Sequence, residues 1–341
     1  MKGYHVAVVG ATGLVGRTML AVLEERNFPV ATLRPIASGR SAGTSVPFRG
    51  ALHPVIEISD EAFAGVDIAL FSAGGDTAKR WAPSATARGA VVIDNSSAFR
   101  MDGDVPLIVP EVNAAALIDT APRIIANPNC STIQMVVALE PLRARYGIHR
   151  IVVCTYQAVS GAGKKGVDQL QTELEGRNAS VRAFAHPIAG NALPHIASFE
   201  RDGFTTEERK MIDETRKIFG DQGIMVSPTC VRIPVVTSHS EAVHVELENP
   251  FALEDIRSIL ENAPGVIVID DPEATAYPLA STATGRDEVF VGRLRRDPSI
   301  DNGLIMWVVS DNLRKGAATN AVQIAELWHA LRQKEEVATE V

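Results

Sequence analysis

The sequence predicts an α/β chain of two domains: a parallel sheet covered by helices, followed by an α+β domain with a mixed sheet. In the first third, short and continuous apolar runs alternate with helical stretches, a pattern typical of strands buried on both faces. From about residue 150 the β-rich stretches become longer and the helices fewer. The length of 341 residues also allows two separate cores.

The elements can be assigned in order along the chain. In the first domain, we expect a helix over 13–26 and strands at 6–9, 30–37, 68–71, 91–93, 107–109 and 123–126. A helical pattern over 132–146 follows, and the later strands are expected at 151–156, 242–247, 266–270, 289–293 and 304–309. The amphipathic helix 316–332 is expected to pack back on the first domain, which gives predicted domains of 1–127 plus 313–341 and 128–312.

Composition excludes several classes of function. A net charge of -8 argues against nucleic acid as the main partner. Cys130, Cys154 and Cys230 are far apart and show neither disulfide nor zinc spacing, which fits a reducing compartment. Cys154 and Cys230 are interpreted as buried packing residues. The first residues do not resemble a signal peptide, and no apolar run has the length of a membrane helix. We therefore expect a soluble cytoplasmic protein without a metal site.

A glycine-rich turn joins the first strand to the first helix. Its spacing is a variant of the dinucleotide fingerprint, in which glycines allow a pyrophosphate to rest on the helix N-terminus. The residues expected to bind the cofactor here are Gly10, Thr12, Gly13, Leu14, Val15 and Gly16.

The end of the second strand indicates which dinucleotide is bound. An acid at this point usually selects NAD, but this loop has Arg40 between the hydroxyls of Ser38 and Ser41, which suits a 2′-phosphate. The sequence therefore predicts NADP(H). Ser72 and Gly74 follow the third strand, where they would pass close to the cofactor or simply form a strand–helix turn.

Cys130 lies on the turn between the run 123–126 and the helical pattern 132–146. The N-terminus of a helix has unpaired N–H groups and favours an anion, so this thiol is expected to ionise readily and act as a nucleophile. The same N–H groups could hold an oxyanion formed by attack on a carbonyl. A buried structural cysteine is the alternative for such a residue taken alone.

Several motifs resemble the aspartate-semialdehyde dehydrogenase family. They are the glycine turn at 10–16, Asn-Pro-Asn-Cys-Ser at 127–131, Gln-Ala-Val-Ser-Gly at 157–161, and Cys-x-Arg at 230–232 followed by His-Ser at 239–240. The matches extend from residue 6 to about residue 326 in the order that the family shows.

The resemblance implies a role for each matching residue. Cys130 is the acylated nucleophile, His239 the acid/base, and Gln157 orients the intermediate. Arg232 binds the substrate carboxylate, and Asn129, beside the nucleophile, also belongs to the substrate site. Glu207 contacts the substrate amino group, whereas Lys210 and Arg100 bind phosphate. The remaining cofactor contacts are Ser160, Gly161 and Gln323. Ser160 precedes and Gly161 begins the segment 161–166, which is interpreted as a mobile glycine-rich loop.

The implied fold is a Rossmann-type NADP-binding domain and a catalytic and dimerisation domain. The implied reaction is the NADPH-dependent conversion of L-aspartyl 4-phosphate to L-aspartate 4-semialdehyde and inorganic phosphate, in the biosynthesis of lysine, threonine, methionine and isoleucine. A homodimer is expected, with a tetramer as the alternative. One alternative is an N-acetyl-gamma-glutamyl-phosphate reductase, against which Glu207 argues because an acetylated amine carries no charge. The other is a non-catalytic nucleotide-binding relative.

Overall fold

A computed structural model describes residues 3–118 and 123–339. For residues 334–339 only the backbone is described. Its contacts divide the chain into one unit of residues 1–128 and 317–341 and a second unit of residues 129–316. The predicted boundaries were 127/128 and 312/313. Residues 1–2, 119–122 and 340–341 of the predicted domains lie outside the described part.

The first unit is built on a six-stranded sheet in which every pairing is parallel, as predicted for this domain. The strand order is β5-β2-β1-β6-β7-β8. The strands of this sheet are β1 (Tyr4–Val9), β2 (Val30–Ala37), β5 (Ile56–Glu57), β6 (Ile68–Phe71), β7 (Val91–Asp94) and β8 (Ile124–Ala126), and a separate hairpin consists of β3 (Ser45–Phe48) and β4 (Ala51–Pro54).

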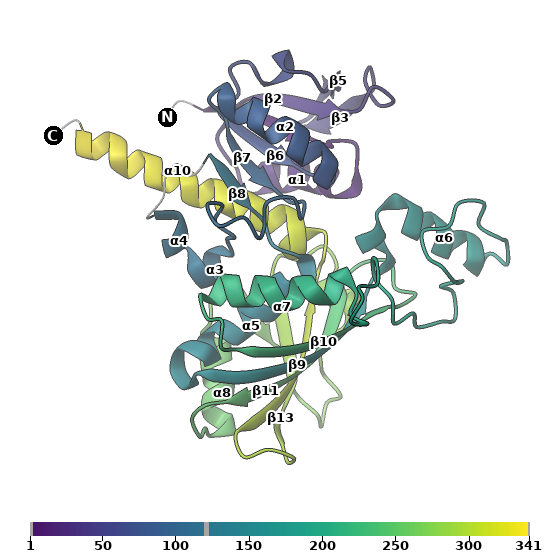
Figure 1. Cartoon of the computed structure of the whole chain (residues 1–341), viewed down its shortest axis with the longest axis vertical. Helices are drawn as coiled ribbons and strands as arrows, with labels where there is room; N and C mark the ends of the chain where they lie inside the picture. The colour runs from purple at the N-terminus through teal and green to yellow at the C-terminus, as the bar shows by residue number, and fades with distance from the viewer. Residues whose placement is uncertain (1–2, 119–122, 340–341) are drawn as a thin grey trace. The chain divides into compact units, whose positions relative to one another are not determined.

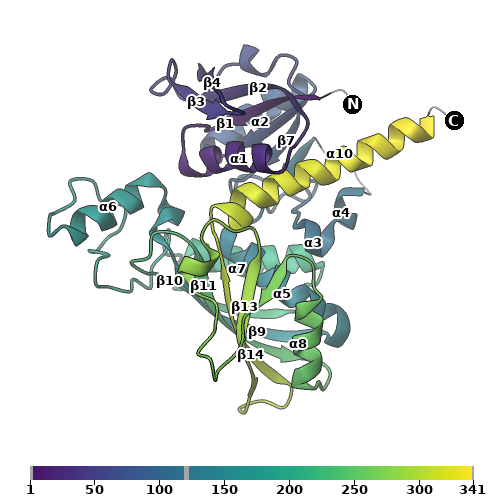
Figure 2. The same ribbon diagram turned by 180° about the vertical axis from the view of Figure 1, so that it is seen from behind.

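Helices cover both faces of this sheet (Figures 1 and 2). On one face, α1 (Leu14–Glu25) and the C-terminal α10 (Thr319–Thr339) lie side by side over a core that includes Val6, Val8 and Leu70. On the other face, α2 (Gly75–Ala87) packs on alternate residues of the same strands. The expected packing of the C-terminal helix on this domain is confirmed. Two short helices, α3 (Pro110–Asn113) and α4 (Ala115–Ile118), precede β8.

The strand expected at 107–109 is wrong. Only Leu107 forms a bridge, to Ala126, and the chain then turns into α3 at Pro110. Proline at positions 106 and 110 removes backbone donors on both sides of the apolar run, so the ladder cannot extend.

The second unit has a mixed six-stranded sheet of order β10-β9-β11-β14-β13-β12, in which two pairings are parallel and three antiparallel. The mixed sheet is the one that the sequence predicts. Its strands are β9 (Ile148–Gln157), β10 (Met225–Arg232), β11 (His239–Leu247), β12 (Val266–Val268), β13 (Val289–Asp297) and β14 (Gly303–Ser310).

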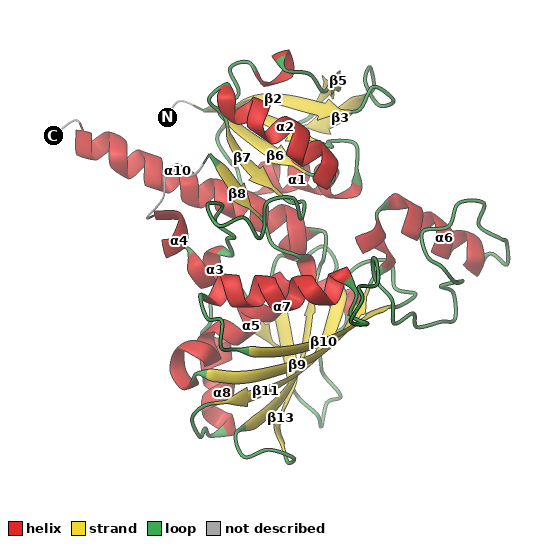
Figure 3. Ribbon diagram, viewed as in Figure 1, coloured by secondary structure: helices red, strands yellow, loops and turns green. Residues whose placement is uncertain are grey.

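Helices of the second unit are more numerous than the sequence indicates, as the colouring of Figure 3 makes plain. They are α5 (Cys130–Tyr146), α6 (Lys164–Leu174), α7 (Thr206–Phe219), α8 (Leu253–Glu261) and α9 (Ala280–Ala283). The segment 161–166, expected as a loop, instead contains the end of a 3-10 turn (Val159–Ala162) and the start of α6. A long irregular stretch follows α6 and leads to α7 (Figure 3). In the described part of the chain, no helix is both long and apolar enough to span a bilayer.

Candidate active site

The turn between β1 and α1 has the geometry that a bound pyrophosphate requires. Gly10 has a φ of 85°, and a Cβ there would come within 2.5 Å of the Ser72 carbonyl oxygen. A Cβ on Gly16 would overlap the carbonyl of Gly10. Among the described residues, no side chain caps α1 at Gly13, so the first N–H groups of the helix, from Leu14 and Val15 onward, fit a phosphate. The residues present therefore fit a dinucleotide.

The other predicted cofactor residues of the first unit lie around this turn or on α10. Thr12 donates to the Ser41 hydroxyl over 3.4 Å, and Ser41 N–H donates to the Ser38 carbonyl. Arg40 is exposed. Gly74 begins α2 with a φ of 84°, two residues after Ser72. Gln323, on α10, donates to the Glu111 carboxylate over 2.9 Å.

One acid near this loop was not predicted. A Cβ on Gly39 would come within 2.7 Å of the Glu57 carboxylate, so β5 places a negative charge beside the segment that carries Arg40. The loop itself has no acid, but the neighbouring strand supplies one. Sequence reasoning could not find it because the pairing of β2 with β5 is non-local.

Cys130 is the first residue of α5, and Asn129 forms the N-cap of this helix. The Asn129 Oδ1 atom accepts the N–H groups of Ser131 and Thr132, at 3.0 and 3.3 Å. The cap therefore already occupies two of the first N–H groups of the helix, from which the sequence predicts an oxyanion site. The backbone N–H of Asn129 donates in turn to Glu214 over 2.6 Å.

His239, at the start of β11, contacts the nucleophile directly. Its Nε2 atom lies 3.3 Å from Cys130 Sγ, and its Nδ1 atom accepts the backbone N–H of Ala158 over 3.0 Å. A backbone N–H can only donate, so Nδ1 must be unprotonated and the ring proton of the neutral imidazole is on Nε2. Burial lowers the pKa of His239 to about 3, and the charge of Arg232 acts in the same direction. The ring therefore presents an N–H to the sulfur.

We expect NMR of selectively labelled histidine to show His239 as the neutral Nε2–H tautomer between pH 5 and pH 8. The reason is that burial and the Ala158 N–H both disfavour the imidazolium. The His239→Asn variant assigns the signal, and the exposed His5 is an internal reference. Titration of the assigned signal near pH 6.5, or an Nδ1–H tautomer, would contradict the hydrogen bond from Ala158.

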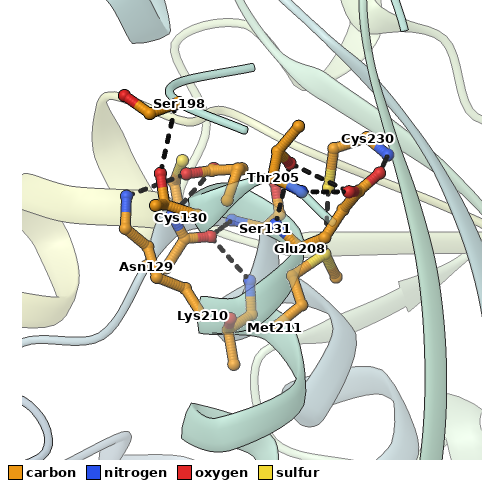
Figure 4. Close-up of polar contacts among 12 residues, drawn as sticks. Asn129, Cys130, Ser131, Ser198, Thr205, Glu208, Lys210, Met211 and Cys230 are labelled. Carbon is orange, nitrogen blue, oxygen red and sulfur yellow. Dashed lines mark hydrogen bonds and ion pairs between the residues drawn. The ribbon is translucent and has the colours of Figure 1, made fainter. Parts of the chain in front are cut away.

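Gln157, Glu207 and Asn129 form one buried polar group beneath the nucleophile. Gln157 Nε2 donates to the Ser131 hydroxyl over 2.7 Å and lies 3.4 Å from Glu207 Oε1. Asn129 Nδ2 donates to the same Glu207 oxygen over 2.9 Å, and Lys210 forms an ion pair with the other oxygen at 3.0 Å (Figure 4). Burial alone would raise the pKa of Glu207, but Lys210 and Asn129 outweigh it and lower this pKa to about 2.

The beginning of α7 explains why Glu207 and Lys210 face this site. Thr205 and Glu208 form the predicted capping box, seen beside Asn129 and Lys210 in Figure 4. The box fixes the helix start, and residues three apart then share a face. Glu207 and Lys210 are therefore held together as predicted.

Arg232, at the end of β10, lies opposite Gln157 in the parallel β9–β10 ladder. Its Nη1 atom donates to the Ala158 carbonyl over 2.6 Å, whereas its buried Nε has no hydrogen-bond partner among the described residues. A Cβ on Gly161 would come within 2.7 Å of Arg232 Nη1 and 3.4 Å of the His239 ring. Gly161 therefore lies against Arg232 and His239, where a larger residue would not fit.

Two further predicted residues have hydrogen-bond partners within their own units. Arg100 belongs to the first unit, where it is buried and donates to the Asn127 and Asn95 carbonyls, both over 2.9 Å. Ser160 belongs to the second unit, and its hydroxyl accepts from Asn312 Nδ2 over 3.0 Å.

Comparisons with known proteins agree over both units. A family model described as semialdehyde dehydrogenase, NAD binding domain matches residues 5–120, and one described as semialdehyde dehydrogenase, dimerisation domain matches residues 139–315. The aspartate-semialdehyde dehydrogenase of Aquifex aeolicus is 58% identical over 332 residues, which cover 95% of this chain and 98% of that protein.

The chain belongs to the aspartate-semialdehyde dehydrogenase family.

Solved structures of this family show the same fold. Aspartate semialdehyde dehydrogenase II of Vibrio cholerae, complexed with ASA, matches with a TM-score of 0.92 and 50% identity, covering 96% of this chain and 98% of that one. The aspartate semialdehyde dehydrogenase of Candida albicans, solved with NADP, matches with a TM-score of 0.77 and 26% identity, covering 97% and 99% of the two chains.

Sequence reasoning missed a second polar row in this aspartate-semialdehyde dehydrogenase family member. Cys230, Thr155 and Glu241 lie opposite one another on β10, β9 and β11, two residues before or after Arg232, Gln157 and His239. Burial raises the pKa values of Cys230 and Glu241. Both carboxylate oxygens of Glu241 are buried and lack a hydrogen-bond partner in the part of the chain that the structure describes. Burial therefore favours the neutral form of both Cys230 and Glu241.

Other contacts around Cys130, made by its neighbour Asn129 and by His239, also have no local sequence signal. Glu214 and the N–H of Ala158 reach the site through tertiary packing alone. A Cβ on Gly316 would come within 2.9 Å of Cys130 Cβ, which explains a glycine at that position. Cys154 is only half-buried, so its interpretation as a buried packing residue is wrong, whereas that of Cys230 is confirmed.

Proposed function

We propose that this chain catalyses the NADPH-dependent reductive dephosphorylation of L-aspartyl 4-phosphate to L-aspartate 4-semialdehyde through a thioester on Cys130. The observation that carries the proposal is the contact of Cys130 Sγ with His239 Nε2, with Arg232 and Glu207 at the same end of the sheet. Membership of the family, and a relative solved with ASA, support the substrate.

Each end of the substrate has a matching side chain. The Nε atom of Arg232 is buried and has no hydrogen-bond partner in the described ranges 3–118 and 123–339, so it can donate to the α-carboxylate as part of a bidentate fork. Glu207 is an anion at neutral pH and suits the substrate ammonium. An N-acetylated substrate would offer it no positive charge, which disfavours the glutamyl-phosphate reductase alternative.

Cys130 and His239 have different roles in the proposed reaction. Cys130 Sγ attacks the acyl carbon, a C–S bond forms, and the bond to the phosphate oxygen breaks. Lys210 and Arg100 are the cations proposed to bind the phosphate that leaves. NADPH, when bound, supplies the hydride that reduces the thioester. The Nε2–H of His239 donates a hydrogen bond to the oxyanion of the tetrahedral adduct. The aldehyde is released when this oxyanion re-forms the C=O bond, the C–S bond breaks and Cys130 is regenerated as the thiolate.

NADP(H) is the proposed cofactor. The turn at 10–16 fits a pyrophosphate, and Arg40 with Ser38 and Ser41 suits a 2′-phosphate. The match to a domain described as NAD binding and the Candida albicans structure with NADP support this assignment. Ser160, Gly161 and Gln323 remain proposed cofactor contacts.

The proposal extends to the assembly and the location of the protein. The match to a domain described as a dimerisation domain supports oligomerisation, and we expect a homodimer, or a tetramer built from two, in the cytoplasm. Sedimentation equilibrium of the purified protein distinguishes the two states.

The proposal is tested in the reverse direction, by NADP reduction with L-aspartate 4-semialdehyde in the presence and absence of inorganic phosphate. We expect NADPH formation that requires phosphate, because phosphate must cleave the thioester. N-acetylglutamate semialdehyde serves as the competing substrate. Activity with that compound alone would assign the chain to the other reductase, and inactivity with both, in a protein that binds NADP, would leave only the nucleotide site.

A further inference from the structure

The guanidinium of Arg232 is held on two sides and open on a third. Nη1 donates to the Ala158 carbonyl over 2.6 Å. The Phe184 ring lies over the guanidinium, with 5.8 Å between the Arg232 Cζ atom and the ring centroid. Nε is buried and has no partner within the described residues. The Ala158 carbonyl binds one edge of the guanidinium, and the Phe184 ring covers one face. The Nε edge therefore remains available to a ligand.

Phe184 belongs to the irregular stretch after α6, yet side chains of α6 hold its backbone. Gln169 Oε1 accepts the N–H groups of Ala183 and Phe184, at 2.7 and 3.2 Å. One helical turn further, Glu173 Oε2 accepts the N–H groups of Ile188 and Ala189, at 2.7 and 2.9 Å. Gln169 also donates to Glu173 over 2.7 Å, so the two holding groups fix each other.

Apolar packing fixes the ring as well. Phe184 packs on a small cluster formed by Val159, Leu170 and Ile188. A Cβ on Gly166 would come within 3.1 Å of the tip of the ring, so the helix approaches the ring as closely as a glycine allows. The segment that ends at Ile188 is therefore a defined support although it has no regular secondary structure.

We propose that Phe184, held by Gln169 and Glu173 of α6, is a positioning residue that orients the Arg232 guanidinium so that its Nε edge receives the carboxylate of the substrate. The proposal rests on the proposed function for the identity of that carboxylate. An arginine that stacks on an aromatic face loses rotational freedom and gains a cation–π attraction, which is stronger in a desolvated site. A leucine at 184 would fill most of the space without providing either.

The first test compares Phe184→Leu with Phe184→Tyr, which keeps the ring. We expect Phe184→Leu to raise the KM for L-aspartate 4-semialdehyde about tenfold, with the KM values for phosphate and NADP within twofold of wild type. Phe184→Tyr should restore the wild-type value. Phe199→Leu is the matched control, because Phe199 lies in the same irregular stretch but is 60% exposed. Equal increases in all three KM values, or no change in any, would overturn the proposal.

The second test needs no turnover. Iodoacetate and iodoacetamide both alkylate Cys130, but only iodoacetate carries a carboxylate for Arg232. The rate ratio of iodoacetate to iodoacetamide, followed by mass spectrometry of the Cys130 peptide, should fall about fivefold in Phe184→Leu and in Gln169→Leu, and stay unchanged in Phe184→Tyr and Phe199→Leu. An unchanged ratio in Phe184→Leu would overturn the positioning role. A reduced ratio in a protein that does not oxidise the semialdehyde would refute the proposed function alone.

Discussion

Replacing Cys130 with alanine is expected to lower kcat by at least about 10^4-fold, equivalent to about 5 kcal/mol of transition-state stabilisation. No other thiol can substitute for it, because burial keeps Cys230 protonated and Cys154 points to the opposite face of the sheet from Thr155 and Gln157. The measurement is phosphate-dependent NADP reduction, and titration of NADP binding by fluorescence should give an unchanged Kd.

The matched controls are Cys154→Ala and Cys230→Ser. Both should keep kcat within about threefold of wild type, although the second loses stability because a hydroxyl replaces a buried sulfur. A Cys130→Ala enzyme that keeps a tenth of the wild-type rate would rule out a covalent route through this residue.

Replacing His239 with asparagine is expected to lower kcat about 10^3-fold, within the range for removal of a hydrogen-bond donor to an oxyanion. The Nε2–H tautomer of His239, which the hydrogen bond from Ala158 fixes, also predicts how the ring acts on Cys130. Because Nε2 already carries a proton, the ring acts as a donor to the reacting oxygen or sulfur and does not take the proton of the thiol at the start. Alkylation of Cys130 by iodoacetamide should therefore slow by less than about tenfold in His239→Asn.

An alkylation rate that falls as far as kcat would show instead that His239 is the base that ionises the thiol. Gln134→Leu is the matched control. Gln134 Nε2 donates to the backbone carbonyl of His239 over 3.5 Å, and among the described residues it forms no hydrogen bond with the imidazole ring. It should leave both rates within about threefold.

The sequence was most informative where local signals repeat. The glycine turn at 10–16 and the apolar runs of β2 and β6 need only their neighbours in the chain to be recognised, and both strands have their predicted bounds. The strand β10 was missed because Pro228 interrupts it and its outward residues Ser227 and Thr229 are polar and exposed. An edge strand tolerates both features, but nothing local marks it as an edge.

The sequence predicts which residues form the candidate site, but it does not predict the strand register and the hydrogen bonds that bring them together. The motifs give Cys130, Arg232 and His239, but the register that aligns three strands is a property of the whole sheet. The Asn129 cap, which occupies the N–H groups expected for an oxyanion, is visible only once the helix start is known. Phe184 has no sequence signal, because its support depends on two side chains of α6 and on a stretch without periodicity.

The contacts of Asn129 with α7 also have a consequence for how the protein is made. Glu214, 85 residues later in the chain, holds the backbone N–H of Asn129, and His239, 109 residues after Cys130, contacts the thiol. At a synthesis rate of about 5–20 residues per second, the thiol leaves the ribosome several seconds before either partner exists. During that interval Cys130 is an ordinary cysteine in an incomplete sheet. Cys130 therefore acquires its contact with His239 only after the chain has been extended through the start of β11.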